Sequence, residues 1–313
     1  MRVPIVDLDR DPVVVAAELD EICREIGFLQ IVAHGVDTAV ADDAWHAAHA
    51  FFDLPLADRM TVAMPTPGYP YGYSPVAGES LRASLGEAGP ADLKESFNAG
   101  PPAPDHPLAP GEAEVYQPTP WPAAVLPELR VTWRAYYAAM LGLGARLMSL
   151  AARGLGLSPD FFADKIDTSP SSLRALNYPA QDGPPEPGQL RAGAHTDYGM
   201  LTMLRQDDAP GGLQVRAGGV WVDVPSVSGA YVVNLGDLMA RWTNDRWRST
   251  LHRVVNPPPS PGVATRRQSM PFFHNANYSA RVACLPTCVG AGPRYEPVTA
   301  GPYLLGKFRE TVT

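Results

Sequence analysis

The sequence predicts a mainly β protein, a sandwich or jelly roll with helices packed outside it, and three observations support this. Proline and glycine number 34 and 28 among 313 residues, roughly a fifth of the chain against about 12% in average proteins. Both residues destabilise helix interiors, which disfavours a helical bundle. Hydrophobic residues still make up 45% and charged residues 19%, which is too apolar for a disordered chain. Short apolar runs separated by turn residues fill the second half, a pattern typical of sandwiches and jelly rolls.

The chain begins with a predicted strand and helix. The strand covers Pro4–Leu8. Asp11 and Pro12 then provide an N-cap acceptor and a first-turn proline, which together start a helix that Gly27 ends. The apolar positions of this helix recur at helical spacing, at Val14, Leu19, Ile22 and Ile26.

A second strand and a second helix follow, over Phe28–Val32 and Ala39–Phe52. His46 and His49 lie three positions apart on this helix, but no carboxylate stands where it would complete a metal-ligand set. We therefore expect a partly exposed helix face. His34 is interpreted as a structural residue of the turn after the strand.

The segment from Pro65 to Pro122 is rich in proline, glycine and tyrosine, and predicts extended loops with little regular structure. Such a stretch is either a linker or a functional lid. Its aromatic residues favour a lid: Tyr69, Tyr71, Tyr73, Phe97 and Trp121. A long helix over Leu129–Leu155 follows, with an apolar stripe suited to face the core.

After Ser158 the sequence predicts short strands separated by turn residues. They cover Leu173–Tyr178, Leu201–Leu204, Gly212–Val215, Val220–Val224, Ala230–Asn234, His252–Val255 and Ser269–Phe273. The Ala217-Gly218-Gly219 run between two of them indicates a hairpin. With no repeat and no linker, we expect one domain over 1–313: a helical and loop region with the lid (1–165), the jelly-roll core (166–290) and a C-terminal segment (291–313).

Charge and composition limit the partners. The formal charge is −8 and no dense Lys/Arg block appears, which argues against nucleic acid or an anionic membrane. The first residues lack the apolar region of a signal peptide. The most apolar long stretch carries four arginines, so it is not a membrane span. We expect a soluble, cytoplasmic monomer that acts on a small molecule.

Three cysteines agree with a reducing compartment. Cys284 and Cys288 could form half of a zinc site, but Pro286 lies between them and no second pair with zinc spacing follows. We expect these thiols to be buried or inert.

Two histidines and an aspartate form the first chemical pattern. His195 and Asp197 stand at the start of a predicted strand, where residues two positions apart project from one face. His252 opens another β run 57 residues later and could supply a third ligand from a neighbouring strand. Two histidines and one carboxylate leave open positions on a metal, as in non-haem Fe(II) oxygenases.

Arg267 and Ser269 form the second pattern, on one face of the strand that leads into Ser269–Phe273. A guanidinium beside a hydroxyl suits a carboxylate held deep in an apolar barrel. The alternative for Arg267 is a surface salt bridge, which the apolar run after it disfavours.

These motifs, in this order, resemble the Fe(II)/2-oxoglutarate-dependent oxygenases, in the isopenicillin N synthase-like branch. The resemblance rests on HTDYGMLTMLRQD, GGLQV, GAYVVNLGDLMARWTN, STLHRVVNP and RQSMPFFHN, and in the first half on VPIVDL, GFLQIVAHGV, FFDLPLADR and DLKESFNAG. It covers nearly the whole chain. It implies a double-stranded β-helix core in which His195, Asp197 and His252 bind iron.

The resemblance also implies roles around the metal. Arg267, Ser269 and Tyr178 would bind the distal carboxylate of 2-oxoglutarate, and Leu176 stands where plant members usually have asparagine. Arg174 falls where members place a pocket-facing basic residue; it could contact the co-substrate, contact an anionic substrate or form a structural ion pair. Candidate substrate residues are Tyr71, Phe97, Arg174, Phe273 and Asn275. His274 is left out because strand alternation places it on the opposite face from Phe273.

The expected activity is a dioxygenase reaction that uses Fe(II), 2-oxoglutarate and O₂ and releases succinate and CO₂. Hydroxylation is the default outcome, with desaturation or ring closure as others. Two alternatives stay open: an Fe(II) oxidase independent of 2-oxoglutarate, like isopenicillin N synthase, and an inactive binding protein on the same barrel. A lid rich in tyrosine and proline suggests a small, partly hydrophobic specialised metabolite, with antibiotic biosynthesis as one setting.

Overall fold

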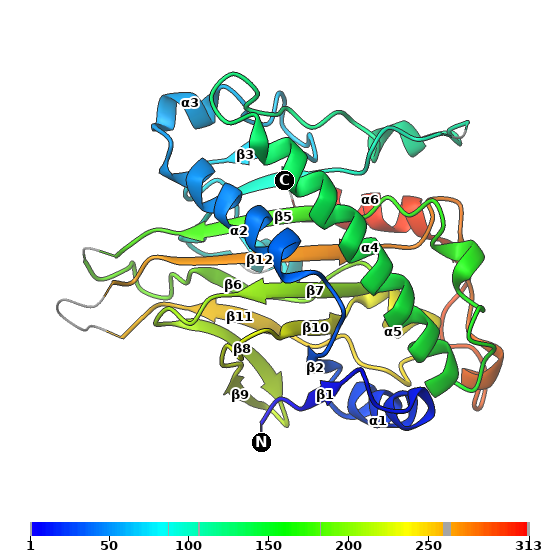
Figure 1. The fold of residues 1–313 in the computed structure, drawn as a ribbon. Helices are drawn as coiled ribbons and strands as arrows, with labels where there is room; N and C mark the ends of the chain where they lie inside the picture. Colours follow the sequence, from blue (N-terminus) through cyan, green and yellow to red (C-terminus); the bar gives the residue numbers. More distant parts are fainter. Residues whose placement is uncertain (1, 87, 106, 182, 259–263, 312–313) are drawn as a thin grey trace.

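Two β-sheets form the centre of the protein in a computed structural model that describes residues 2–86, 88–105, 107–181, 183–258 and 264–311 (Figure 1). The larger sheet has eight strands, in the spatial order β1 (Ile5–Asp7), β2 (Phe28–Val32), β10 (Tyr231–Leu235), β7 (Leu201–Gln206), β12 (Arg267–His274), β5 (Ser172–Tyr178), β4 (Glu95–Ala99) and β3 (Gly72–Ser74). The smaller sheet has four, β6 (Ala192–His195), β11 (His252–Val255), β8 (Gly212–Ala217) and β9 (Val220–Asp223). A short pair joins β13 (Arg281–Val282) to β14 (Val298–Thr299). The predicted mainly β fold with flanking helices is confirmed.

The helices lie outside the sheets. They are α1 (Pro12–Glu25), α2 (Thr38–Asp53), α3 (Leu56–Met60), α4 (Glu128–Gly154), α5 (Asp237–Trp242) and α6 (Ala300–Thr311). Single 3₁₀ turns are η1 (Leu81–Leu85), η2 (Glu112–Glu114), η3 (Ala163–Lys165) and η4 (Pro286–Cys288). The long helix α4 runs across one face of the larger sheet, with α2 beside it (Figure 1). No helix in the described ranges combines the length and the apolar character that a membrane crossing needs.

A local sequence signal starts the first helix, and a side-chain contact holds the second helix against α4. The Asp11 side chain accepts a hydrogen bond from the backbone N–H of Val13 at 2.7 Å, so the predicted cap starts α1. Val14 does not face the core as expected, because it is 53% exposed and Val15 is fully buried in its place. The indole of Trp133 on α4 donates to the backbone oxygen of Ala44 at 3.1 Å, which ties α4 to α2.

The prediction of little regular structure between Pro65 and Pro122 is wrong in part. Strands β3 and β4 lie in this segment, and β4 pairs with β5, so they extend the larger sheet. These strands are short and flanked by glycine and proline, so the amino-acid composition of the segment does not indicate them. Within the same segment η1 packs against β6 and α6.

The backbone requires glycine in the turn between β8 and β9 and at the end of α1. Gly218 and Gly219 both have positive φ angles, 57° and 85°, and join β8 to β9 in the predicted hairpin. Gly27, which ends α1, has a φ of 63°, and a Cβ there would lie 2.0 Å from the backbone oxygen of Arg248. Any larger residue at this position would therefore push the chain between β2 and α1 away from the segment before β11.

Candidate metal centre

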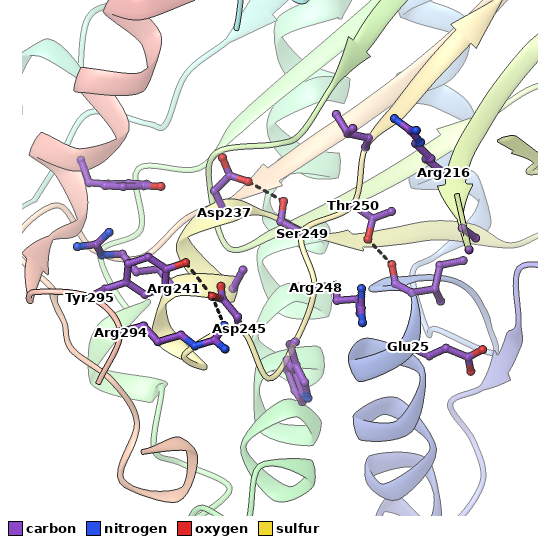
Figure 2. Close-up of a pocket in the computed structure, with 17 residues that line it drawn as sticks. Glu25, Arg216, Asp237, Arg241, Asp245, Arg248, Ser249, Thr250, Arg294 and Tyr295 are labelled. Atoms are coloured by element: carbon purple, nitrogen blue, oxygen red, sulfur yellow. Dashed lines mark hydrogen bonds and ion pairs between the residues drawn. The ribbon is translucent and has the colours of Figure 1, made fainter. Parts of the chain in front are cut away.

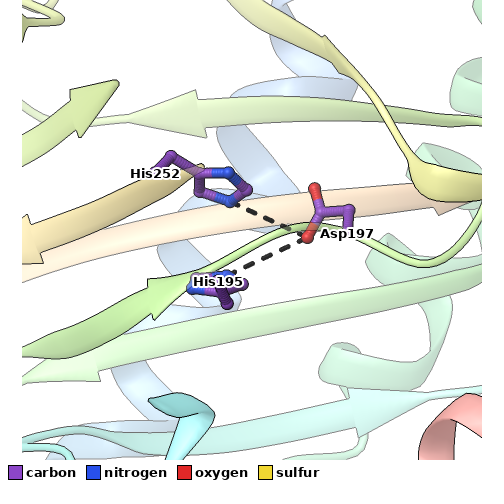
Figure 3. A group of neighbouring side chains, drawn as sticks. All are labelled: His195, Asp197 and His252. Carbon is purple, nitrogen blue, oxygen red and sulfur yellow. Dashed lines mark ion pairs between the residues drawn. The ribbon is translucent and has the colours of Figure 1, made fainter. Parts of the chain in front are cut away.

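The structure brings together the three predicted metal ligands (Figure 3). Strands β6 and β11 pair antiparallel with His195 directly opposite His252, and their ring centroids lie 4.3 Å apart. Oδ1 of Asp197 lies 4.0 Å from Nε2 of His195 and 3.8 Å from Nε2 of His252. One ligand atom from each residue falls within 4.8 Å of the others, close enough for all three to bind one ion.

Asp197 reaches this point by a different route from the one that the sequence suggested. Strand β6 ends at His195, and Asp197 lies in the turn between β6 and β7, so the two do not share a strand face. The backbone oxygen of Asp197 accepts a hydrogen bond of 2.7 Å from the backbone N–H of Asp237, the first residue of α5. The start of α5 therefore fixes the turn that presents the carboxylate.

Backbone carbonyls orient both histidines. Nδ1 of His195 lies 2.8 Å from the oxygen of Gly193, and Nδ1 of His252 lies 3.1 Å from the oxygen of Thr250. Because a carbonyl oxygen only accepts, each Nδ1 carries the proton and each Nε2 keeps a lone pair for a metal. Burial, with His252 nearby, lowers the pKa of His195 to about 4, which keeps this imidazole neutral.

The aspartate is held by its other oxygen. Oδ2 of Asp197 accepts hydrogen bonds from the amide of Asn234, at 2.7 Å, and from the hydroxyl of Thr202. Burial acts to raise the pKa of Asp197, but the two histidines and these hydrogen bonds outweigh it and hold the pKa below its usual value. The carboxylate is therefore ionised, with Oδ1 left for a metal. This donor set of two imidazoles and one carboxylate fits Fe(II).

Arg267, Ser269 and Tyr178 meet on the face of the larger sheet that also carries Thr202. Arg267 on β12 pairs with Tyr178 on β5, and its Cζ lies 5.3 Å from the centre of the tyrosine ring. The Tyr178 hydroxyl is 3.5 Å from that of Ser269. Arg267 is 2% exposed, and Nη2 donates to Gln206 at 2.6 Å while the buried Nη1 has no partner in the described residues. An unpaired buried guanidinium nitrogen beside two hydroxyls fits a carboxylate ligand.

Arg174 lies on the same face of β5 and forms the ion pair that was one of its three possible roles. Nε donates to Oδ1 of Asn98 at 2.6 Å, and Nη2 donates to Glu79. Glu79 also accepts from the buried Lys94 at 3.1 Å. Burial would raise the pKa of Glu79, but the charges of Arg174 and Lys94 lower it to about 2. This pair ties the segment before η1 to the sheet.

Two candidate substrate residues are buried in contacts with other parts of the chain. Phe97 is opposite Ala175 in the register, so it projects from the other face of the sheet from Arg174. Its ring is fully buried against Phe51 of α2, at 4.7 Å, and Trp133 of α4, at 5.5 Å. Its assignment to the substrate was wrong, because the aromatic signal came from packing against the helices.

Tyr71 is 4% exposed, and its hydroxyl donates to the backbone oxygen of Val115 at 2.6 Å. Its ring lies so close to Gly100 that a Cβ there would be 2.3 Å away. The hydroxyl and the ring of Tyr71 therefore both hold the loop segment in place.

The two β12 candidates differ. Phe273 is partly exposed on the same face as Arg267, as predicted, and pairs with Thr202, the residue that holds the metal-ligand carboxylate. The amide of Asn275 donates to the backbone oxygen of Pro170 at 3.2 Å, so this side chain braces the end of the strand. His274 lies on the opposite face as predicted, against Gly144 of α4.

A cavity of about 800 Å³ lies outside the triad, between α1, α5 and the C-terminal segment (Figure 2). Two of its charged groups have partners: Arg294 pairs with Asp245 at 2.8 Å, and Asp237 accepts from the hydroxyl of Ser249 at 2.7 Å. Among the described residues, the triad is the cluster that could hold a metal, and Cys284 and Cys288 belong to no such group.

Sequence reasoning missed the residues that support the ligands. Asn234 and Thr202 lie on neighbouring strands in register with each other, and no local spacing connects them to Asp197. Asp92, whose Oδ1 accepts from the backbone N–H of Gly193 at 2.9 Å, sits in the segment that composition marked as irregular.

Two histidines on paired strands of one sheet and a carboxylate from the turn that follows form the ligand set of non-haem iron oxygenases. Residues 170–276 match the model of the 2OG-Fe(II) oxygenase superfamily, and residues 3–124 match that of the N-terminal region of non-haem dioxygenases in morphine synthesis. The chain is 36% identical over 94% of its length to the 2-oxoglutarate-Fe(II) type oxidoreductase hxnY of Emericella nidulans, covering 84% of that protein. The chain belongs to the 2OG-Fe(II) oxygenase superfamily.

Two other relatives agree. The chain is 33% identical to validamycin A dioxygenase of Streptomyces hygroscopicus subsp. limoneus, covering 99% of this chain and 87% of that protein. Its fold is similar to that of a full-length Neurospora crassa protein crystallised in complex with alpha-KG, with a TM-score of 0.84, 30% identity and coverage of 98% and 95% of the two chains. The predicted family, jelly-roll core, Fe(II), 2-oxoglutarate and O₂ are confirmed, and the protein is a 2-oxoglutarate-dependent dioxygenase. These relatives do not favour the 2-oxoglutarate-independent oxidase or the inactive binding protein.

Proposed function

We propose that this dioxygenase oxidises a C–H bond of a small, partly apolar molecule that lies against Phe273 and Arg174. The register of the larger sheet carries the proposal: Phe273 is directly opposite Thr202, which hydrogen-bonds the metal ligand Asp197. A partly exposed aromatic ring thus lies beside the residue that holds the metal-ligand carboxylate. Arg267 begins the same strand at its other end, so substrate and distal carboxylate have separate ends of one face.

Different side chains would bind the metal, exclude water and contact the substrate. His195, Asp197 and His252 would hold Fe(II), which with 2-oxoglutarate and O₂ supplies the oxidant that removes hydrogen from the substrate and leaves succinate and CO₂. Phe273 would exclude water from the reacting carbon. Arg174, already paired with Glu79, would offer its remaining guanidinium edge to a polar group of the substrate.

Arg267, Ser269 and Tyr178 would bind the distal carboxylate of 2-oxoglutarate. The free Nη1 of Arg267 supports this role. Breaking a buried charge pair costs about 3–5 kcal/mol, so Arg267→Met should weaken 2-oxoglutarate binding by at least about 100-fold. Anaerobic titration of the Fe(II) protein with 2-oxoglutarate measures this, and affinity within threefold of wild type would contradict the assignment.

The substrate class can be tested directly. The Neurospora crassa relative has also been crystallised with thymine, a small planar molecule with polar edges, and thymine is a suitable first probe. We expect succinate production from 2-oxoglutarate to rise in the presence of the substrate, and Phe273→Ala to raise the KM for it more than it lowers kcat. A panel of small molecules that never stimulates succinate release, with 2-oxoglutarate bound, would contradict a small-molecule substrate.

We also propose a cytoplasmic monomer, folded as one domain, that serves specialised metabolism, with antibiotic biosynthesis as one setting. Three free cysteines support a reducing compartment, and the relative named validamycin A dioxygenase supports the setting. Sheet pairing of β2 with β10 and of β4 with β5 supports one domain, because each pair joins the first half of the chain to the second. Cell fractionation and light scattering during size exclusion test the first two points.

A further inference from the structure

We propose that Arg191 is a second cation of the site that binds the distal carboxylate, and that it makes the enzyme select 2-oxo acids with a negatively charged far end. This rests on the proposed role of Arg267. Arg191 is fully buried, just before β6, and no motif of the family resemblance assigns it a role.

The two arginines flank one tyrosine. Cζ of Arg191 lies 5.8 Å from the ring centre of Tyr178, and Cζ of Arg267 lies 5.3 Å from it. Consecutive glycines at the start of β8 contact both: a Cβ on Gly211 would lie 3.0 Å from Nη1 of Arg191, and one on Gly212 would lie 3.8 Å from Nε of Arg267. The two guanidinium groups therefore share one buried region.

This region carries one more positive than negative charge. Arg267 faces Asp207, at 3.7 Å from Nε to Oδ1. Arg191 forms no ion pair with any residue that the structure describes, and its buried Nε has no hydrogen-bond partner there. Burial, with the charge of Arg267, lowers the pKa of Arg191 to about 10. A ligand carboxylate would bring the buried charges into balance, because two guanidinium groups would then face two carboxylates.

Arg191 is also fixed in place by the ends of two loops. Nη1 donates to the backbone oxygen of Pro210 at 2.8 Å, and Nη2 donates to that of Thr265. These loops precede β8 and β12, so Arg191 joins the strand that carries Arg267 to the strand that carries His195. The guanidinium is thus held near the carboxylate site by the backbone.

The test compares two ligands, 2-oxoglutarate and 2-oxopentanoate, which share the metal-binding 2-oxo acid but differ in the distal carboxylate. Anaerobic Fe(II) protein is titrated with each by calorimetry. We expect Arg191→Met to weaken 2-oxoglutarate at least about tenfold, or about 1.4 kcal/mol, while 2-oxopentanoate changes less than threefold. Arg191→Lys, which keeps the charge, should retain most of the preference.

Arg205→Met is the matched control, because Arg205 is a partly buried arginine over Trp45, on the face of the larger sheet opposite to that of Arg267. It should leave both affinities unchanged. A purely structural role for Arg191 predicts equal weakening of both ligands in Arg191→Met, and unchanged preference would overturn the proposal. If that variant does not fold, a structure of the wild-type complex decides: Arg191 turned away from the distal carboxylate overturns it. If wild-type protein does not bind 2-oxoglutarate, the proposed role of Arg267 fails instead.

Discussion

Replacing Thr202 by valine should weaken Fe(II) binding about tenfold while leaving the fold intact. Valine keeps the shape and β-branching of threonine but removes the hydroxyl that donates to Oδ2 of Asp197. A hydrogen bond to a charged group is worth about 1.5–3 kcal/mol. The hydrogen bond exists with or without the metal. Fe(II) affinity therefore depends only on the part of its free energy that keeps Oδ1 turned toward His195 and His252. Asn234 also still holds Oδ2 in the variant. We therefore expect the lower end, about 1.4 kcal/mol or tenfold, at the low limit known for residues that support metal ligands.

The assay is anaerobic titration of metal-free protein with Fe(II) in competition with a chelator, read beside a urea unfolding curve. Thr243→Val is the matched control, because Thr243 is a fully buried threonine whose hydroxyl donates to the backbone oxygen of Met239 in α5. It should lose stability but keep its Fe(II) affinity. Equal Fe(II) affinity in Thr202→Val and wild type would refute the reasoning, since the carboxylate would then need no support. Tighter binding would also refute it, by showing that the hydroxyl acts mainly to make Asp197 a weaker ligand.

Three further predictions concern packing and pH. Burial lowers the pKa of His274 to about 4, so the unfolded chain binds its proton first and stability should fall as pH drops from about 6.5 toward 4. His274→Leu should make this slope shallower by up to about 1.4 kcal/mol per pH unit in urea unfolding of the metal-free protein, with His195 and His34 still contributing to the slope. Gly144→Ala should destabilise the protein by about 1–3 kcal/mol, because the new Cβ would lie 2.9 Å from the His274 ring. Gly142→Ala on the same helix meets nothing within 4 Å and should stabilise the protein by up to about 1 kcal/mol. Thermal unfolding that ranks the two variants the other way would contradict this packing. Phe97→Ala should cost about 3–5 kcal/mol of stability yet leave 2-oxoglutarate affinity unchanged, and a selective loss of that affinity by calorimetry would return Phe97 to the site.

The metal ligands could be predicted because they lie in short motifs that are recognisable in the sequence. His195, Asp197 and His252 stand beside apolar β runs, and Arg267 and Ser269 keep a strand-face spacing, so each pattern is visible within a few residues. The path of the chain between the ligands could not be predicted, since the turn at Asp197 depends on backbone donors from α5, about 40 residues away.

Residues whose role depends on register remained hidden. Asn234 and Arg191 reach the site only through pairing of strands that lie far apart in the sequence, and nothing adjacent to either marks it. The prediction that Phe97 contacts the substrate was wrong for a related reason: a one-residue shift along a strand exchanges the two faces of a sheet. Its neighbours in the sequence do not show which face meets the helices.

The position of β12 has a consequence for how the protein folds. This strand is among the last of the larger sheet in the sequence, yet it lies between β7 and β5 in the middle of it. The sheet therefore cannot close until residues 267–274 have left the ribosome, and the earlier strands wait with unpaired edges. Such long-range pairing slows folding and exposes intermediates to aggregation. Truncation before β12 should accordingly yield chains that chaperones retain.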